Sequence, residues 1–140
     1  MTEKFYPIED IEGIGATYGE KLRAAGVDDT GALLEKAASR KGREALAAET
    51  GVSEKLILTW VNHADMMRIS GIGPQYAELL ENAGVDTLKE LRTRNAENLA
   101  EKMAATNAAR KVKVTGHVPG ASTIQRWIDD AQGMEPRITH

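Results

Sequence analysis

The chain has 140 residues, the size of one ordinary domain or of two small ones that share an interface. It is 41% hydrophobic and 28% charged, which argues against wholesale disorder, and it lacks cysteine, which excludes disulfides, thiolate zinc sites and cysteine nucleophiles. The net charge is −3: the first 64 residues carry eight Lys/Arg and eleven Asp/Glu, and the remainder carries ten of each. Neither half has the basic excess of a strong nucleic-acid binder.

Helical patterns run through the first part of the chain, residues 1–64. The first helix carries an apolar stripe and ends at Gly26, because glycine readily adopts the left-handed conformation that closes helices. A further helix covers about residues 41–50 and is closed by Gly51. A long amphipathic helix, Ser53–Arg68, follows, with Ser53 as its N-cap and apolar residues at three- and four-residue steps.

The second part, residues 65–132, repeats this order. Its first helix ends at Gly84, the capping-box pattern Thr87–Glu90 starts the next, and helices follow over about 96–107 and 121–132. No strand is persuasive, since the alternating stretch Lys111–Val114 is too short to pair and favours an extended loop. We expect the tail, 133–140, to be loosely held.

The two parts are copies of one design. Residues 11–28 and 69–86 share eleven identities in eighteen positions at a constant offset of 58. Trp60 and Trp127 also match, at an offset of 67, so the second unit carries extra residues between about 107 and 119. The repeat predicts an all-α protein of two similar units in tandem, 1–64 and 65–132, which share the Ser53–Arg68 helix.

Each unit contains an apolar–x–Gly–Ile–Gly turn between two helical stretches. In the second unit this turn is Ile69–Gly73, and Pro74 suits the first helical position that follows. Gly71 and Gly73 permit unusual dihedrals, and we expect them to leave main-chain N–H groups exposed beside a helix N-terminus. Such donors, together with the helix dipole, attract anions.

Ile69-Ser70-Gly71-Ile72-Gly73-Pro74 resembles the hairpin of the helix-hairpin-helix family, and Ile11-Glu12-Gly13-Ile14-Gly15 resembles it almost as well. Over roughly residues 5–138 the chain is similar to a bacterial family of unknown function built from two such units, with a SAM-like helical fold. The resemblance implies non-catalytic binding of DNA backbone phosphate without sequence readout. The implied phosphate donors are Gly71, Gly73 and Gln75 in the second unit and Gly13, Gly15 and Thr17 in the first.

The resemblance also implies that a monovalent cation, K⁺ or Na⁺, can sit on main-chain carbonyls beside the turn. The matching carbonyls are those of Met67, Ile69 and Ile72 in the second unit, and of Glu9, Ile11 and Ile14 in the first. The chain departs from the family pattern in its charges: no Lys or Arg follows the second turn before Lys89, and Glu12 stands inside the first.

Several clusters of positive charge could neutralise phosphate in place of the missing residues. Lys21 follows the first turn, and the densest cluster, Arg110, Lys111 and Lys113, lies in the extra loop of the second unit. Arg40, Lys41 and Arg43 form another cluster, and Arg92 and Arg94 hold a comparable place in the second unit. The other interpretation of these clusters is a solvated face.

The remaining candidates favour packing over chemistry. We expect Trp60 and Trp127 to pack in the core, and Tyr18 and Tyr76 to support the turns. The histidines at 63, 117 and 140 have no metal-type spacing, and no catalytic motif is present, so we predict neither an enzyme nor a small-molecule substrate.

Two functions follow from this pattern. The first is a module that binds nucleic acid weakly through its glycine turns. The second is a protein–protein interaction or scaffold module with purely structural turns, favoured by the acidic balance, whose apolar docking face would involve Met66, Met67 or Met103. No apolar run reaches the roughly 20 residues of a membrane span and the start lacks an apolar signal core, so we expect a cytoplasmic protein without a membrane partner.

Overall fold

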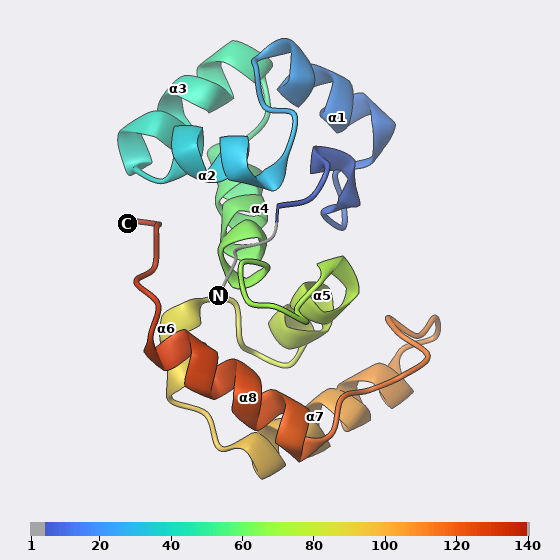
Figure 1. Ribbon diagram of the computed structural model, residues 1–140. Helices are drawn as coiled ribbons and strands as arrows, with labels where there is room; N and C mark the ends of the chain where they lie inside the picture. The colour runs from blue at the N-terminus through green and yellow to red at the C-terminus, as the bar shows by residue number, and fades with distance from the viewer. Residues whose placement is uncertain (1–4, 140) are drawn as a thin grey trace.

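A computed structural model describes residues 5–139 of the chain. Within these residues the protein is all-α, with eight α-helices, one short 3-10 helix and no strand, which confirms the predicted fold class (Figure 1). The 3-10 helix η1 spans Ile8–Asp10, and the α-helices are α1 (Gly15–Ala24), α2 (Thr30–Ala37), α3 (Arg40–Thr50), α4 (Glu54–Met66), α5 (Pro74–Asn82), α6 (Leu88–Arg92), α7 (Ala96–Ala109) and α8 (Ala121–Gln132).

Local chemistry sets most helix ends. Ser53 Oγ accepts a hydrogen bond from the Leu56 N–H at the start of α4, and Thr87 Oγ1 accepts one from the Glu90 N–H at the start of α6. Three of the chain's glycines close helices with positive φ angles, as predicted; they are Gly26, Gly51 and Gly84. Helix α7 runs two residues beyond the predicted end at 107.

The two units repeat one packing scheme. Helices α2 and α3 pack on α4 in the first unit, and α6 and α7 pack on α8 in the second. Trp60 and Trp127 lie at the centre of these packings and are 2% and 0% exposed, so the prediction of core tryptophans is confirmed. Figure 1 shows α4 running from the first unit toward α5 of the second, and its residues 60–66 are all buried.

The C-terminal tail has more contacts than the sequence predicts. Residues 133–139 run from the end of α8 back toward the first unit (Figure 1). The Thr139 N–H donates to the Ala38 carbonyl over 2.8 Å, and Arg43, which is 5% exposed, donates to the Thr139 carbonyl over 2.7 Å. The tail therefore ties the two units together, and only its last residue lies outside the described range.

No helix among residues 5–139 combines the length and the apolar character that crossing a bilayer requires.

Candidate functional site

The two glycine turns, Ile11–Gly15 and Ile69–Gly73, share their first half. Each is closed by a main-chain hydrogen bond between its two isoleucines, of 3.2 Å in the first turn and 3.1 Å in the second. Gly13 has a φ of 92° and Gly71 a φ of 98°, and both residues are exposed. Residues with a Cβ avoid this region, so glycine is required at both positions.

The second glycine of each turn differs between the units. Gly15 has a φ of 60°, whereas Gly73 has a φ of −93° and a ψ of −172°. Gly73 therefore does not use the unusual dihedrals that glycine permits, because it is the extended N-cap of α5 and Pro74 is the first helical residue. A Cβ on Gly73 would lie 3.8 Å from the Tyr6 hydroxyl oxygen, an ordinary contact, so the backbone there tolerates a side chain.

Main-chain donors are free at the second turn. Among the described residues, the N–H groups of Gly71 and Gly73 donate no hydrogen bond to the protein main chain or side chains. The N–H of Gln75 lies in the first turn of α5, where no intrahelical acceptor exists. The turn residues border a shallow recess of about 390 Å³, which we call the turn recess. Its lining consists of Tyr6, Gly71, Gly73, Pro74, Gln75 and Tyr76.

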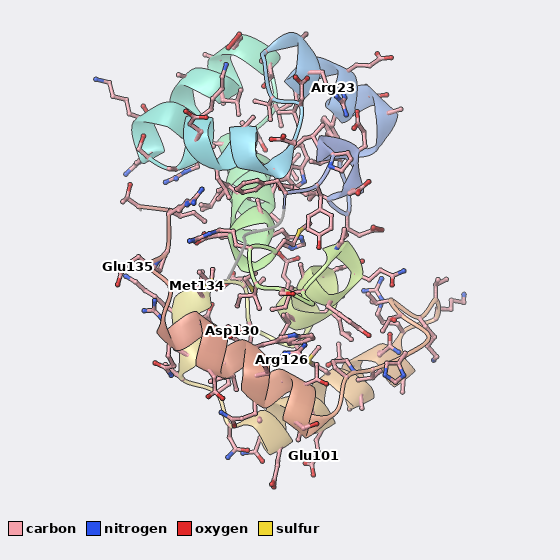
Figure 2. All side chains as sticks on the ribbon, viewed as in Figure 1. Arg23, Glu101, Arg126, Asp130, Met134 and Glu135 are labelled. Atoms are coloured by element: carbon pink, nitrogen blue, oxygen red, sulfur yellow. The ribbon has the colours of Figure 1, made fainter. Side chains whose placement is uncertain are left out.

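Arg126 on α8 supplies the positive charge that the sequence analysis missed at this turn. One of its guanidinium nitrogens lies 3.2 Å from the position that a Cβ on Gly71 would take. Arg126 is exposed, carries no ion pair or hydrogen bond with any part of the chain that the structure describes, and lies on the side of α8 turned toward α5 (Figure 2). The repeated tryptophans could have indicated Arg126 from the sequence. Each tryptophan lies against the glycine turn of its own unit, so the residue before it lies near that turn as well. This residue is Arg126 before Trp127 and Thr59 before Trp60.

Trp127 and Tyr76 support the second turn from beneath. Their ring centroids are 5.4 Å apart, and Tyr18 and Trp60 repeat this contact at 5.2 Å in the first unit. The indole nitrogen of Trp127 lies 3.0 Å from the Cβ position of Gly71 and has no hydrogen-bond partner among the described residues. Its N–H dipole is therefore directed at the turn without being neutralised.

The first turn is surrounded by a different set of charges. Glu12 is exposed inside the turn. Arg23 is held by Glu9 through two hydrogen bonds of 2.6 Å, which lower the pKa of Glu9 to about 2. Lys21 is the cation nearest in sequence to this turn. It is exposed, and its ammonium group lies 6.0 Å from the centre of the Tyr18 ring. Gly13, Gly15 and Thr17 are exposed as well.

The loop between α7 and α8 carries the predicted cluster Arg110, Lys111 and Lys113. It lies against α5, since the Tyr76 hydroxyl donates to the His117 carbonyl over 2.9 Å. Two of the three cations are engaged: Arg110 lies 3.8 Å from Glu78, and Lys113 donates to the Ala108 and Arg110 carbonyls at the end of α7. Lys111 is exposed.

Glu78 lies between charges of opposite sign on the loop side of α5. Its pKa is raised, first by burial and then by the negative charge of Glu12, while Arg110 acts in the opposite direction. A carboxylate of the first glycine turn is thus close enough to influence the helix that follows the second turn.

Three arginines of the other predicted cation clusters bind main-chain carbonyls, while Arg40 and Lys41 are exposed. Arg43 is buried and donates to the Ala37, Ala38 and Thr139 carbonyls. Arg92 donates to the Ala131 and Met134 carbonyls, and Arg94 to the Gly84 carbonyl. These arginines satisfy main-chain carbonyls at helix ends and along the tail. The interpretation of a solvated or phosphate-binding face is wrong for Arg43, which is buried, whereas Arg92 and Arg94 are half-buried.

Main-chain carbonyl oxygens, which are ligands that K⁺ and Na⁺ can bind, lie near the second turn. The Ile69 carbonyl already accepts the Ile72 N–H, as the Ile11 carbonyl accepts that of Ile14, so a cation would share this oxygen. No group of three or more His, Cys, Asp or Glu side chains among residues 5–139 is arranged to hold a metal ion.

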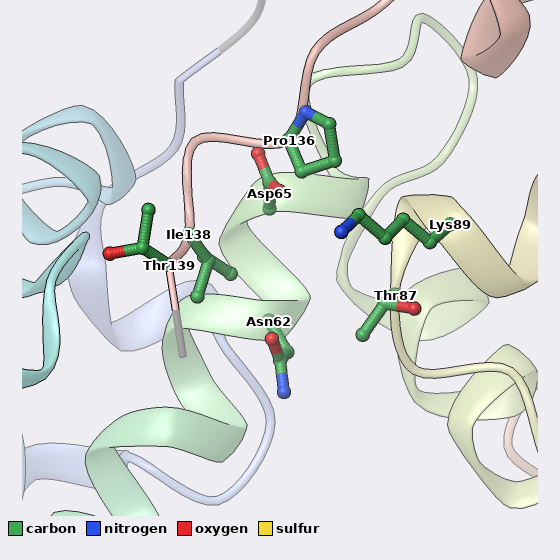
Figure 3. Close-up of a pocket in the computed structure, with 7 residues that line it drawn as sticks. All are labelled: Asn62, Asp65, Thr87, Lys89, Pro136, Ile138 and Thr139. Atoms are coloured by element: carbon green, nitrogen blue, oxygen red, sulfur yellow. The ribbon is translucent and has the colours of Figure 1, made fainter.

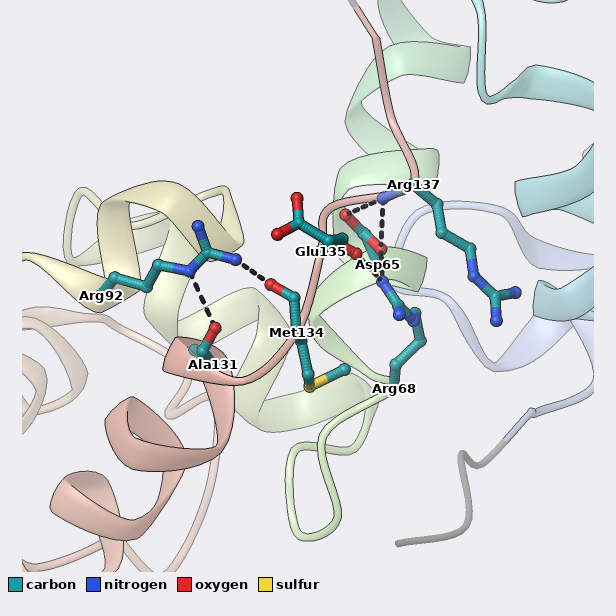
Figure 4. Close-up of polar contacts among 7 residues, drawn as sticks. All are labelled: Asp65, Arg68, Arg92, Ala131, Met134, Glu135 and Arg137. Atoms are coloured by element: carbon teal, nitrogen blue, oxygen red, sulfur yellow. Dashed lines mark hydrogen bonds and ion pairs between the residues drawn. The ribbon is translucent and has the colours of Figure 1, made fainter.

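A second cavity, of about 390 Å³, lies between α4, α6 and the tail (Figure 3). Its polar wall includes Asp65, whose carboxylate is buried, lies 2.6 Å from Arg68 and accepts the Arg137 N–H (Figure 4). Arg68 in turn donates to the Glu135 carbonyl over 3.0 Å. Burial raises the pKa of Asp65, and the arginine beside it opposes that shift. The network attaches the tail to α4.

The prediction of an apolar docking face at three methionines is wrong. Met66, Met67 and Met103 are each 0% exposed, because they fill the core. The large hydrophobic side chains exposed among the described residues are Phe5 and Val112.

Comparison with known proteins places the chain in a family. The profile described as "Domain of unknown function (DUF4332)" matches residues 12–134, which include the second glycine turn, the first from Glu12 onward, and all eight α-helices. The chain belongs to this family. No curated protein and no solved structure gives a significant match. The family assignment confirms the resemblance to a family of unknown function, and it leaves the activity to be argued from the turns themselves.

Proposed function

We propose that the chain is a non-catalytic module that binds nucleic-acid backbone without sequence preference, and that the second glycine turn acts as a helix-hairpin-helix phosphate site. The observation that carries the proposal is the free N–H groups of Gly71 and Gly73 beside the unpaired guanidinium of Arg126. Main-chain donors and an arginine are the groups that hold phosphate oxygens in proteins.

The site favours an anion through three contributions. The N–H groups at the start of α5 donate to phosphate oxygens and add the positive end of the helix dipole. Arg126 supplies a full positive charge, and the unpaired indole N–H of Trp127 adds its dipole from beneath the turn. A monovalent cation on the carbonyls of Met67, Ile69 and Ile72 would add to the same field.

Few cations surround the turn, so the affinity should be low. Lys111 is exposed on the loop between α7 and α8, and Glu78 on α5 carries a negative charge close to that of Glu12. We expect a dissociation constant of about 10⁻⁴–10⁻⁶ M, the range of non-specific nucleic-acid binding, and a shallow salt dependence. The first turn, with Gly13, Gly15, Thr17 and Lys21, is the weaker of the two sites, because the position that Arg126 holds is Thr59 there.

Fluorescence anisotropy with labelled single-stranded and duplex DNA, at about 50 and 200 mM salt, tests the proposal. Gly73→Glu places a carboxylate among the phosphate donors without backbone strain, since the φ of Gly73 is ordinary. Gly73→Gln is its uncharged control of nearly equal shape. We expect Gly73→Glu to abolish the salt-sensitive signal and Gly73→Gln to keep most of it.

A second pair of variants isolates the guanidinium. Arg126→Gln should weaken binding about three- to tenfold at low salt and reduce the salt slope by about one ion. Arg40→Gln makes the same chemical change on exposed residue 40 of α3 and should leave binding unchanged. Absence of binding by the wild type at low salt, or equal effects of the two arginine variants, would refute the proposal and leave the scaffold function.

A further inference from the structure

The turn recess is built by both units of the chain. Tyr6 belongs to the segment before η1, yet its hydroxyl lies beside Gly73 of the second turn. Two hydrogen bonds fix its main chain: the Tyr6 N–H donates to Thr30 Oγ1 over 2.9 Å, and the Thr30 N–H donates to the Tyr6 carbonyl over 2.8 Å. An aromatic ring anchored in the first unit therefore forms one wall of the anion site of the second.

The form of the recess suits a flexible strand better than a rigid duplex. A volume of about 390 Å³ bordered by Tyr6, Pro74 and Tyr76 accommodates a flat ring next to the free N–H groups of the turn. In a duplex the faces of the bases are stacked on one another, so that only the backbone and the base edges in the grooves are exposed. In a single strand an unpaired base can leave the stack and lie against an aromatic side chain.

Of the two tyrosines, only Tyr6 has a free hydroxyl. The Tyr76 ring packs on Trp127 and its hydroxyl donates to the His117 carbonyl. The Tyr6 side chain is partly exposed and, within residues 5–139, its hydroxyl has no hydrogen-bond partner. Burial and the charge of Asp10 raise its pKa, so the hydroxyl stays protonated.

A negative charge near the recess discriminates further. Asp10 lies close enough to Tyr6, a residue that lines the recess, to act on the ionisation of its hydroxyl. A duplex brings two backbones of phosphates toward this charge, whereas a single strand brings one. Repulsion therefore costs the duplex more.

Besides the N-terminus of α5, the anion site contains a buried hydrogen-bond donor that has no partner among the described residues. Trp127 is 0% exposed, and its indole nitrogen, which no described residue pairs, is directed at Gly71. An unpaired buried donor is costly, and in native proteins such groups call for an explanation. An anion held at the turn explains it, because the indole dipole then lies in the field of a negative charge.

We propose that the turn recess selects single-stranded nucleic acid, with a phosphate on the Gly71–Gly73 turn and Arg126 and an unpaired base against the ring of Tyr6. This inference rests on the proposed function, and it adds the class of nucleic acid and the residue that selects it. Stacking of one base on an aromatic side chain changes affinity about five- to a hundredfold on its removal.

The test compares a labelled oligothymidylate with the same strand in a duplex, at about 50 mM salt. We expect the wild type to bind the single strand at least about fivefold more tightly. Tyr6→Leu keeps an apolar side chain of similar reach and should lose this preference, while Tyr6→Phe keeps the ring and should retain it. Phe5→Leu is the matched control, because Phe5 is the neighbouring aromatic residue and lines a different cavity.

The outcomes separate the two proposals. If both oligonucleotides bind equally, Arg126→Gln weakens both and Tyr6→Leu changes neither, the preference for single strands is refuted and the phosphate site stands. If neither oligonucleotide binds, the proposed function fails and this inference fails with it. If Tyr6→Phe behaves like Tyr6→Leu, stacking is refuted as the source of the preference. Helical circular dichroism of each variant confirms that it is folded.

Discussion

The two glycine turns offer a matched pair of substitutions, Gly13→Ala and Gly71→Ala. Both glycines have φ angles above 90°, so an alanine at either position must enter a conformation that L-residues avoid. They differ in what the new methyl group meets. At Gly13 the nearest atom is the Trp60 indole nitrogen at 3.8 Å, an ordinary contact, whereas at Gly71 the Trp127 indole nitrogen lies at 3.0 Å.

The expected magnitudes follow from these contacts. The left-handed conformation costs about 1–2 kcal/mol for an L-residue, and alanine recovers about 0.4–1 kcal/mol by restricting the unfolded chain. Gly13→Ala should therefore destabilise the protein by about 1 kcal/mol. Gly71→Ala adds an overpacking cost of about 1–3 kcal/mol, because Trp127 is fully buried and packed on Tyr76 and cannot move freely.

Urea unfolding of the two variants, followed by circular dichroism and by tryptophan fluorescence, measures the difference. We expect Gly71→Ala to lose at least about 1 kcal/mol more than Gly13→Ala, which corresponds to a further drop in Tm of about 2–4 °C. Gly73→Ala is the control, since its φ is ordinary and its new methyl group would meet only the Tyr6 hydroxyl at 3.8 Å. Equal losses at positions 13 and 71 would refute the argument that Trp127 closes the second turn.

Three further predictions concern the polar groups that hold the units together. Arg43→Met should cost about 2–4 kcal/mol in thermal or urea unfolding, because Arg43 satisfies three carbonyls, whereas Arg40→Met at the exposed neighbouring site should stay within about 0.5 kcal/mol. Asp65→Asn removes the buried carboxylate charge that pairs with Arg68 and accepts the Arg137 N–H; we expect a loss of about 1.5–3 kcal/mol, the range for hydrogen bonds to charged groups, and faster proteolysis of the tail, and unchanged cleavage would contradict the role of this network. His63 and Glu81 form a hydrogen bond of 2.9 Å, which lowers the pKa of Glu81 in the folded protein. The contact therefore stabilises the fold at pH values above the pKa that Glu81 has in the unfolded chain. This stabilisation is lost as the pH falls through the lower pKa of Glu81 in the folded protein. Stability measured between about pH 5 and pH 3 should therefore fall less steeply for Glu81→Gln than for the wild type.

The candidate site was predictable only in part. Gly71, Gly73 and Gln75 are implied by the resemblance to the helix-hairpin-helix family, and they lie together around one recess. Arg126 and Tyr6 were not found, since they are 55 and 65 residues away in sequence from Gly71 and enter the site only through packing of α8 and of the N-terminal segment.

The sequence by itself determined the helices, their caps and the duplication. The helices and their caps depend on interactions within about four residues, such as the caps at Ser53 and Thr87 and the left-handed glycines at the helix ends, and the duplication is visible as repeated residues. An apolar stripe indicates which face of a helix is buried, but it does not indicate which other element covers that face. Only the tertiary structure decided that Arg43 and Arg92 satisfy carbonyls while Arg126 stays free, because a long side chain pairs with whatever distant backbone the packing brings within its reach.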